Sequence, residues 1–262
     1  MIFDSHVHTA VSPDSEMLPE EAIDTLKKQG LGCIFTEHMD YGLDCKPFFC
    51  ADLKTYFDDY IKYKSDTVGL GLEIGLLTEC LEINRALAAN PVLDYVIGSI
   101  HFTGGYDLGL YPEYFVQTGE KVYELHLAFM LEMIKAGDFF DALGHIDYIS
   151  RYSPFPEKNV LYEKYAGQYD EILRTLIERD IVLELSSKRV ADKYARKNLY
   201  AIYSRYRDLG GQYVTIGSDA HIAKDLGRNF DIAINMVDEI GLVPVYFKER
   251  RRILCNPISC LR

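Results

Sequence analysis

The sequence lacks an excess of positive charge. Its 28 lysines and arginines are outnumbered by 40 aspartates and glutamates, so the formal net charge is -12. The basic residues are dispersed, whereas binding to a nucleic-acid backbone or to an anionic membrane surface requires a concentrated basic patch. The composition therefore predicts neither nucleic-acid nor membrane binding, and it favours a small substrate.

Long hydrophobic runs are missing as well. The run from Val92 to Ile100 is far shorter than the roughly 20 apolar residues of a membrane-spanning helix, and it contains Asp94. The first residues do not form the basic and then apolar pattern of a secretory signal. We therefore expect a cytoplasmic protein.

The cysteines lack the CxxC spacing that is typical of zinc modules and redox motifs. A chain of 262 residues can bury enough apolar surface to fold without disulfides. We expect reduced thiols that serve mostly in packing. They are Cys33, Cys45, Cys50, Cys80, Cys255 and Cys260.

Linkers rich in proline, glycine or serine, internal repeats and low-complexity segments are also absent. Hydrophobic residues make up 48% of the sequence, which suffices for one large core. We therefore expect residues 1–262 to form a single domain.

What the sequence does contain is a series of short apolar runs rich in β-branched residues, each followed by a segment with helical periodicity. This is the pattern of repeated strand–helix units, whose strands pair in parallel and are fully buried. The expected strands are Met1–Ser5, Gly32–Thr36, Val68–Glu73, Tyr95–Ser99, Phe139–Gly144, Ile181–Leu185 and Tyr213–Gly217. The pattern favours an α/β fold, a distorted (β/α)7 TIM-like barrel, over an open doubly wound sheet.

Two helices are well marked between the strands. Pro19–Gln29 begins with a proline, which suits the first helical turn, and Thr118–Ala136 has apolar residues at helical spacing. The predicted apolar stripe of the second helix consists of Val122, Leu125, Phe129 and Met133.

Histidines follow the predicted strands. Six of the seven lie at or just beyond the carboxyl end of a strand, and in a parallel barrel these ends converge on one mouth. They are His6, His8, His38, His101, His145 and His221. The seventh, His126, lies inside the helix predicted over residues 118–136, and we expect a surface or helix-face residue outside the site.

Carboxylates occupy equivalent positions at Glu73, Asp219 and Asp14. Imidazole nitrogen and carboxylate oxygen are the ligands of zinc, manganese and iron in proteins. His6 and His8 are two residues apart in an extended segment, so both can point at one ion. This pair alone is a weak indication, but the whole set predicts a multinuclear metal site at the carboxyl ends of the strands.

These residues resemble the polymerase-and-histidinol-phosphatase (PHP) family over nearly the whole chain. The matching segments are Asp4-Ser5-His6-Val7-His8, Thr36-Glu37-His38, Gly71-Leu72-Glu73, Gly98-Ser99-Ile100-His101, Gly144-His145 and Gly217-Ser218-Asp219-Ala220-His221. Within the family, Ser12-Pro13-Asp14-Ser15 and Gly144-His145-Ile146-Asp147-Tyr148 look most like the monofunctional histidinol-phosphate phosphatases of histidine biosynthesis. The resemblance implies one PHP-type catalytic domain that hydrolyses a small phosphorylated substrate, L-histidinol phosphate, to L-histidinol and phosphate.

The resemblance also implies a centre of two to three divalent ions, with zinc, manganese or iron as candidates. The implied ligands are His6, His8, Glu73 and Asp219 for one ion, Glu73, His101 and His145 for a second, and Asp14, His38 and His221 for a third. Glu73 would bridge the first two ions. Some relatives have histidine where this chain has Asp14. The residues implied to be catalytic are Glu73, Asp219 and His221.

Two closely spaced ions can lower the pKa of a shared water to near neutrality, so that a bridging hydroxide attacks phosphorus in line. Arg151 and Arg189 follow the fifth and sixth predicted strands, and we expect both to bind the phosphate. The alternative for either arginine is a solvated surface charge. Asp4 and Glu37 would each orient a ligand imidazole, or would only satisfy local backbone donors.

Two further functions stay open at this point. One is a PHP phosphoesterase that acts on another substrate, such as a phosphotyrosine peptide, a nucleotide or a sugar phosphate. The other is a metal-binding regulatory protein that kept the ligands and lost turnover. A panel of substrates separates these possibilities.

Overall fold

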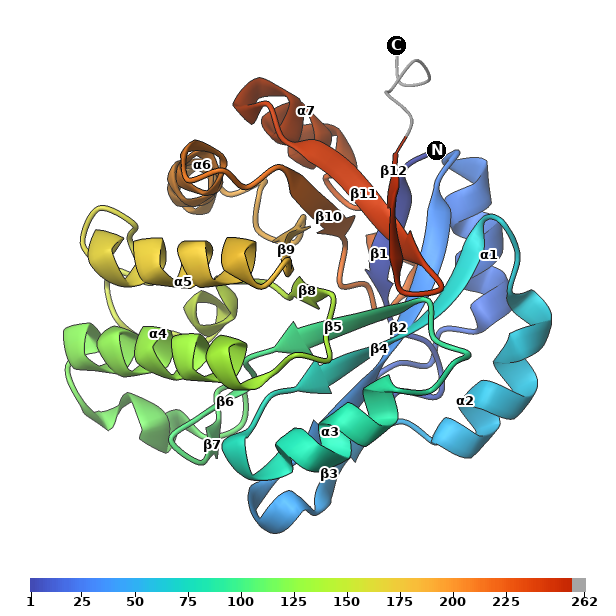
Figure 1. The fold of residues 1–262 in the computed structure, drawn as a ribbon, viewed down its shortest axis with the longest axis horizontal. Helices are drawn as coiled ribbons and strands as arrows, with labels where there is room; N and C mark the ends of the chain where they lie inside the picture. The colour runs from blue at the N-terminus through green and yellow to red at the C-terminus, as the bar shows by residue number, and fades with distance from the viewer. Residues whose placement is uncertain (256–262) are drawn as a thin grey trace.

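The computed structural model describes residues 1–255, and Cys260 of the predicted thiols lies outside them. A mostly parallel sheet forms the centre of an α/β fold (Figure 1). In order across the sheet, its strands are β1 (Phe3–Val7), β2 (Gly32–Tyr41), β4 (Val68–Gly75), β5 (Tyr95–Ser99), β8 (Ala142–Leu143), β9 (Val182–Ser186), β10 (Tyr213–Gly217), β11 (Val243–Lys248) and β12 (Arg251–Leu254). Each of the seven predicted strands overlaps one of these, and the prediction of an α/β fold is confirmed.

The first and seventh of the predicted strands approach each other at their carboxyl ends. Val7 forms an isolated parallel bridge with Ala220. The N–H of His8 donates to the Ala220 carbonyl at 2.9 Å, and the N–H of Asp219 donates to the His6 carbonyl at 2.9 Å. The last residues of β1 and the segment after β10 are therefore hydrogen-bonded side by side.

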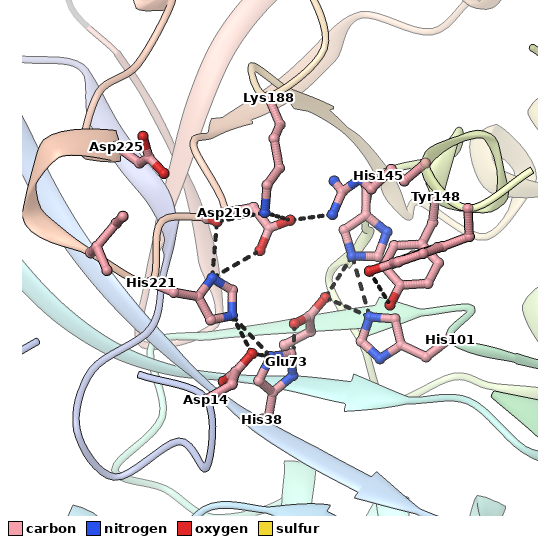
Figure 2. Close-up of a pocket in the computed structure, with 13 residues that line it drawn as sticks. Asp14, His38, Glu73, His101, His145, Tyr148, Lys188, Asp219, His221 and Asp225 are labelled. Atoms are coloured by element: carbon pink, nitrogen blue, oxygen red, sulfur yellow. Dashed lines mark hydrogen bonds and ion pairs between the residues drawn. The ribbon is translucent and has the colours of Figure 1, made fainter. Parts of the chain in front are cut away.

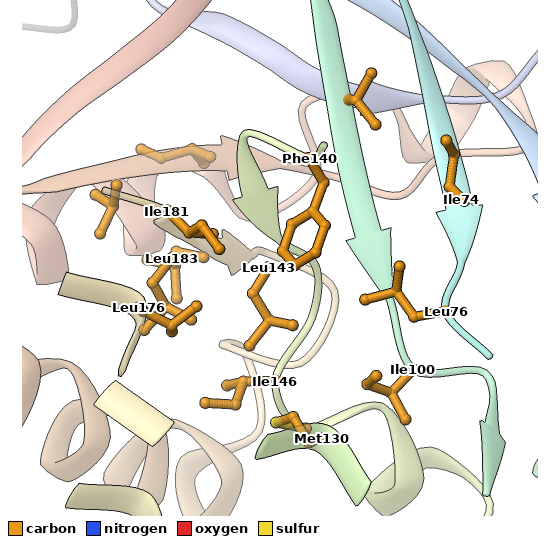
Figure 3. Packing of buried hydrophobic residues seen from close by; sticks show 14 of the residues in the cluster. Ile74, Leu76, Ile100, Met130, Phe140, Leu143, Ile146, Leu176, Ile181 and Leu183 are labelled. Carbon is orange, nitrogen blue, oxygen red and sulfur yellow. The ribbon is translucent and has the colours of Figure 1, made fainter. Parts of the chain in front are cut away.

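Helices surround the strand array in Figure 1. They are α1 (Pro19–Lys28), α2 (Leu53–Tyr60), α3 (Leu81–Ala88), α4 (Gly119–Ala136), α5 (Ala166–Glu178), α6 (Lys193–Asp208) and α7 (Phe230–Ile240). Apolar side chains fill the layer between strands and helices, as Figure 3 shows for Leu143 and Leu183 beside Met130 of α4 and Leu176 of α5. Within residues 1–255, no helix combines the length and the apolar character needed to span a membrane.

The bounds of two strands differ most from the prediction. β2 continues to Tyr41 rather than ending at Thr36, because Met39 and Asp40 pair with β3 (Pro47–Cys50) in an antiparallel hairpin. β8 is shorter than the predicted Phe139–Gly144, because the Phe139 carbonyl accepts a hydrogen bond from Arg250 at 2.6 Å instead of from a neighbouring strand.

The sequence prediction missed three antiparallel hairpins. The first is β2–β3. The second joins the two-residue strands β6 (Phe102–Thr103) and β7 (Tyr106–Asp107), and the third joins β11 and β12. The β11–β12 hairpin covers the amino ends of the strands. There Tyr246 stacks on Phe3 with ring centroids 3.9 Å apart, and Phe247 stacks on Tyr95 at 5.1 Å.

Helix α4 follows the prediction in extent and in part of its buried face. Thr118 caps it, since its side chain accepts from the Lys121 N–H. Of the predicted stripe, Val122 and Met133 are buried, whereas Leu125 is 38% exposed. The whole buried face consists of Val122, Tyr123, His126, Leu127, Met130, Met133 and Ile134. The buried face includes residues at four-residue steps, namely Val122, His126 and Met130. The prediction of His126 as a surface residue is therefore wrong.

Candidate metal centre

The histidines and carboxylates from the strand ends come together around one cavity of about 260 Å³ (Figure 2). Its lining residues are Asp14, His38, Glu73, His101, His145, Tyr148, Arg151, Tyr152, Lys188, Asp219, His221, Ile222 and Asp225. Residues from β2 and β4 and from the segments after β1, β5, β8, β9 and β10 thus share one pocket. The convergence expected from parallel strand ends is what the structure shows.

The carboxylate of Glu73 lies in the middle of the imidazoles and is fully buried. Its Oε2 is 3.2 Å from Nε2 of His6 and 3.4 Å from Nε2 of His8. Its Oε1 is 3.2 Å from Nε2 of His101 and 2.7 Å from Nε2 of His145. Glu73 therefore stands between two pairs of histidines.

The first pair is completed by Asp219. Its Oδ1 lies 3.9 Å from Nε2 of His6 and 3.7 Å from Nε2 of His8. Donors around one tetrahedral zinc, each about 2.0–2.2 Å from it, are about 3.3–3.6 Å apart. The spacing among these four side chains is close to that of a single coordination shell.

In the second pair, Nε2 of His101 and Nε2 of His145 face each other at 3.4 Å. Together with Oε1 of Glu73 they form a compact triangle of buried donors. Two neutral imidazole nitrogens that face one another can share a cation between their lone pairs, or one of them must be protonated.

The third group lies beside Glu73 and His8, with Asp14 and His221 toward solvent. Oδ2 of Asp14 is 2.9 Å from Nε2 of His221 and 3.6 Å from Nε2 of His38, and the two ring nitrogens are 3.3 Å apart. Burial opposes ionisation of Asp14, but hydrogen bonds from both histidines hold its pKa well below the usual range. His8 also lies within reach of this group, so the three donor sets adjoin one another.

Unpaired polar atoms indicate that this donor set fits metal ions. Among the described residues, Nε2 of His6, Nε2 of His8 and Oε2 of Glu73 are buried but form no hydrogen bond, although the two nitrogens lie 3.2 and 3.4 Å from the oxygen. Buried polar atoms normally have a hydrogen-bond partner. Burial opposes protonation of His38, yet the negative charge of Glu73 and contacts with Asp14 and other carboxylates raise its pKa to about 10. The cluster thus requires positive charge, which divalent ions would supply.

The geometry of the strands depends on glycines at two close approaches. A Cβ on Gly217 would collide with Cβ of His6, and a Cβ on Gly75 would collide with the carboxylate of Asp40. Only glycine lets β10 and β4 come this near to the site residues on their neighbours.

Two further carboxylates, which were not predicted from the sequence, contact the Nδ1 atoms of two of these histidines. Oε2 of Glu184 lies 2.8 Å from Nδ1 of His6, and Oδ1 of Asp40 lies 2.7 Å from Nδ1 of His101. Such partners fix the tautomer and orientation of a metal-binding histidine. An acidic residue inside an apolar, fully buried strand is the signal that would have found Glu184.

Asp4 and Glu37 act differently from the first of the two roles considered for them. Asp4 accepts from the N–H and hydroxyl of Ser218 at 2.8 and 2.6 Å. Glu37 accepts from the hydroxyls of Thr9 and Ser12, both at 2.6 Å. Neither carboxylate contacts a ring nitrogen, so they hold the loops that follow β10 and β1.

The two predicted phosphate arginines differ in position. Arg151 lines the cavity and forms an ion pair with Asp219. Arg189 is not among the lining residues, because its guanidinium donates to Asp147 at 2.6 Å and to Asn159 at 2.7 Å. The cation beside Arg151 is instead Lys188, whose Nζ lies 3.2 Å from Oδ2 of Asp219 (Figure 2).

His126 is outside the cavity and completely buried. Its Nδ1 lies 3.0 Å from the hydroxyl of Thr103 on β6. Burial in the apolar layer lowers the pKa of His126 to about 3. This histidine is therefore a neutral packing residue.

Comparisons with known proteins show which family and which enzymes the chain is similar to. The PHP domain family matches residues 4–188. A probable histidinol-phosphatase of Clostridium acetobutylicum is 41% identical over 95% of this chain and 98% of its own length. The histidinol-phosphatase of Lactococcus lactis is 30% identical over 84% of both chains.

A solved structure extends the similarity to three dimensions. The crystal structure of histidinol phosphate phosphatase from Lactococcus lactis, complexed with zinc, L-histidinol and phosphate, is similar with a TM-score of 0.88 and 27% identity. The similarity covers 96% of this chain and 98% of that chain. It includes the residues beyond position 188.

Proposed function

The chain belongs to the PHP domain family, and from that premise we propose that it hydrolyses L-histidinol phosphate to L-histidinol and phosphate. The observation that carries this proposal is the position of Glu73 between two pairs of buried histidines, beside the cations Arg151 and Lys188. A relative with the same fold has been crystallised with zinc, L-histidinol and phosphate.

We assign the metal ligands in three sets, for two to three divalent ions. The assignment is His6, His8, Glu73 and Asp219 for the first, Glu73, His101 and His145 for the second, and Asp14, His38 and His221 for the third. Glu73 would bridge the first two sets through its two oxygens. When bound, divalent ions at these sets would lower the pKa of a water molecule and neutralise charge on the phosphoryl oxygens.

The side chains around the centre would bind and orient the phosphate ester. Arg151 and Lys188 both contact Asp219, so their positive charges lie at the edge of the metal sets and face the cavity. Charge-assisted donors at this position suit a phosphate dianion. We therefore retain Arg151 as a phosphate-binding residue and assign to Lys188 the role that the sequence predicts for Arg189.

Asp219 combines two functions in this proposal. One of its oxygens faces the histidines of the first set, and the other accepts from Arg151 and Lys188. Burial opposes its ionisation, but the adjacent cations hold the pKa of Asp219 well below the usual range. It therefore stays a carboxylate, and it links the metal sets to the residues that would hold phosphate.

We also infer that seven strands close as a distorted barrel within a single catalytic domain. They are β1, β2, β4, β5, β8, β9 and β10. The hydrogen bonds between the ends of β1 and the segment after β10 support this closure. A biosynthetic role on a small substrate fits the cytoplasmic location that the composition predicts.

A substrate panel tests the proposal. The metal-loaded protein is assayed for phosphate release from L-histidinol phosphate, a phosphotyrosine peptide, a nucleoside monophosphate and a sugar phosphate. We expect kcat/KM to be highest for L-histidinol phosphate. A higher kcat/KM for another ester would mean that the protein is a phosphoesterase with a different substrate. No turnover of any ester would favour a metal-binding regulatory protein.

A further inference from the structure

Two cysteine thiols outside the metal centre lie sulfur to sulfur. Sγ of Cys45 is 2.7 Å from Sγ of Cys80, although the residues are 35 positions apart in the sequence. Both are free thiols in the structure. Because a disulfide bond is about 2.05 Å long, the two sulfurs need to approach by only about 0.7 Å to form one.

Hydrogen bonds to backbone carbonyls hold the two sulfurs close to each other. The thiol of Cys45 donates to the carbonyl of Glu79 at 2.9 Å, and the thiol of Cys80 donates to the carbonyl of Gly42 at 3.7 Å. Each thiol therefore contacts the turn that carries the other. The backbone at Cys45 has φ of 51°, a left-handed conformation that local preference disfavours.

The two thiols differ in accessibility. Cys45 is partly exposed, whereas Cys80 is buried. Burial and the adjacent thiol raise the pKa of Cys80 to about 12. An oxidant from solvent would therefore react with Cys45 first.

The pair lies just beyond two strands of the metal centre. The short 3-10 helix Leu43–Cys45 follows β2, which carries His38, and the short 3-10 helix Thr78–Cys80 follows β4, which carries Glu73. Phe49 on β3 packs edge-on against His38, with ring centroids 5.2 Å apart. A bond between the sulfurs would fix the β2–β3 hairpin against this histidine.

We propose that Cys45 and Cys80 are a reversible thiol–disulfide modification site in the turns that follow β2 and β4. The oxidant is a low-molecular-weight disulfide. The thiolate of Cys45 attacks one of its sulfurs, which forms a mixed disulfide and releases one small thiolate. The small thiolate that leaves accepts the proton of Cys80. The thiolate of Cys80 then attacks Sγ of Cys45 and releases the second small thiolate, which takes a proton from solvent. Two protein thiols and one small disulfide thus become one protein disulfide and two small thiols.

The test uses the metal-loaded full chain and oxidised glutathione. We expect a mass loss of two hydrogen atoms, a cross-linked peptide that joins residues 45 and 80, and reversal by a reducing agent. The thermal midpoint should rise by about 5–10 °C, because the bond closes a long loop. We expect the bridged protein to lose metal to a chelator more slowly than the reduced protein does, because the hairpin beside His38 is fixed.

Three variants separate this site from general thiol reactivity. Cys80→Ser should accumulate a stable glutathionyl group on Cys45, and Cys45→Ser should form neither bridge nor adduct at this place. Cys50→Ser is the matched control: its thiol faces the Asp40 carbonyl at 3.1 Å, and the variant should bridge as the unaltered protein does. A bridge to any other cysteine, or none at all, would overturn the proposal. Equal rates of metal loss before and after bridging would overturn its link to the centre.

Discussion

Oε2 of Glu184 lies 2.8 Å from Nδ1 of His6, on the side of the ring away from the centre of the site. The other nitrogen of the same ring, Nε2, faces Glu73 at 3.2 Å. Both Glu184 and His6 are fully buried. The carboxylate thus keeps the proton on Nδ1 and leaves the lone pair of Nε2 directed at the metal set.

Replacement of Glu184 tests this relationship. In Glu184→Gln the side chain keeps its size and one acceptor but loses its charge, so His6 becomes a weaker ligand. We expect metal affinity to fall roughly 10–100-fold, measured by competition with a chelator. Glu171→Gln on the exposed face of α5 is the control and should bind metal normally. Unchanged affinity in the Glu184 variant would contradict the role given to this carboxylate.

His101→Ala tests the second metal set. The substitution removes one of the three donors of this set, which are Oε1 of Glu73 and the Nε2 atoms of His101 and His145. It also leaves Oδ1 of Asp40 without its imidazole partner. We expect at least about 100-fold loss of kcat and fewer bound metal ions per chain. Elemental analysis and circular dichroism are measured on the same sample. A folded variant with normal turnover would rule out the bridged arrangement.

Lys188 and Arg189 are neighbours with different predicted effects. Lys188→Met should lower kcat/KM roughly 10–100-fold, because a charged hydrogen bond to phosphate is worth about 1.5–3 kcal/mol. Arg189→Met should instead lower the thermal midpoint, because the buried carboxylate of Asp147 loses its partner. If kcat/KM depends on Arg189 and not on Lys188, the sequence-based choice of Arg189 was right.

His126 gives a pH dependence of stability. Burial lowers its pKa to about 3, so the unfolded chain takes up a proton near pH 6.5 while the folded chain does not. The contribution of His126 to the free energy of unfolding is therefore fully present above pH 6.5 and is lost as the pH falls toward 3. Between pH 7 and pH 5 the loss is about 2 kcal/mol.

The variant His126→Gln isolates this contribution, because glutamine can still hydrogen-bond to Thr103 but does not titrate. Urea unfolding of both metal-loaded proteins at pH 7 and pH 5 gives the comparison. The variant should lose about 2 kcal/mol less on acidification than the unaltered protein. Equal losses would mean that His126 is not buried as a neutral ring.

The sequence predicted the strands well where apolar runs were bounded by turns, as for Tyr213–Gly217, which matches β10. It failed where a tertiary contact decides the boundary. β8 is cut short by Arg250, a residue more than 100 positions away, and periodicity carries no such information. The β11–β12 hairpin depends on aromatic packing against Phe3 and Tyr95, which is equally non-local.

The candidate site was predictable because its residues share a position, the carboxyl end of a strand. This common placement groups residues as distant as His6 and His221 on the basis of strand pattern alone. The choice between Lys188 and Arg189 was not predictable, since adjacent residues in a loop point in directions that periodicity does not define. His126 was correctly placed outside the site, but its burial was missed because an apolar helical stripe can be drawn through more than one set of positions.

The most direct test of the central claim is removal and return of the metal. The protein is freed of metal with a chelator and assayed for phosphate release from L-histidinol phosphate, before and after addition of zinc, manganese or iron. We predict loss of turnover without metal and its recovery with at least one of these ions. Equal phosphate release by the metal-free and the restored protein would contradict a metal-dependent phosphatase.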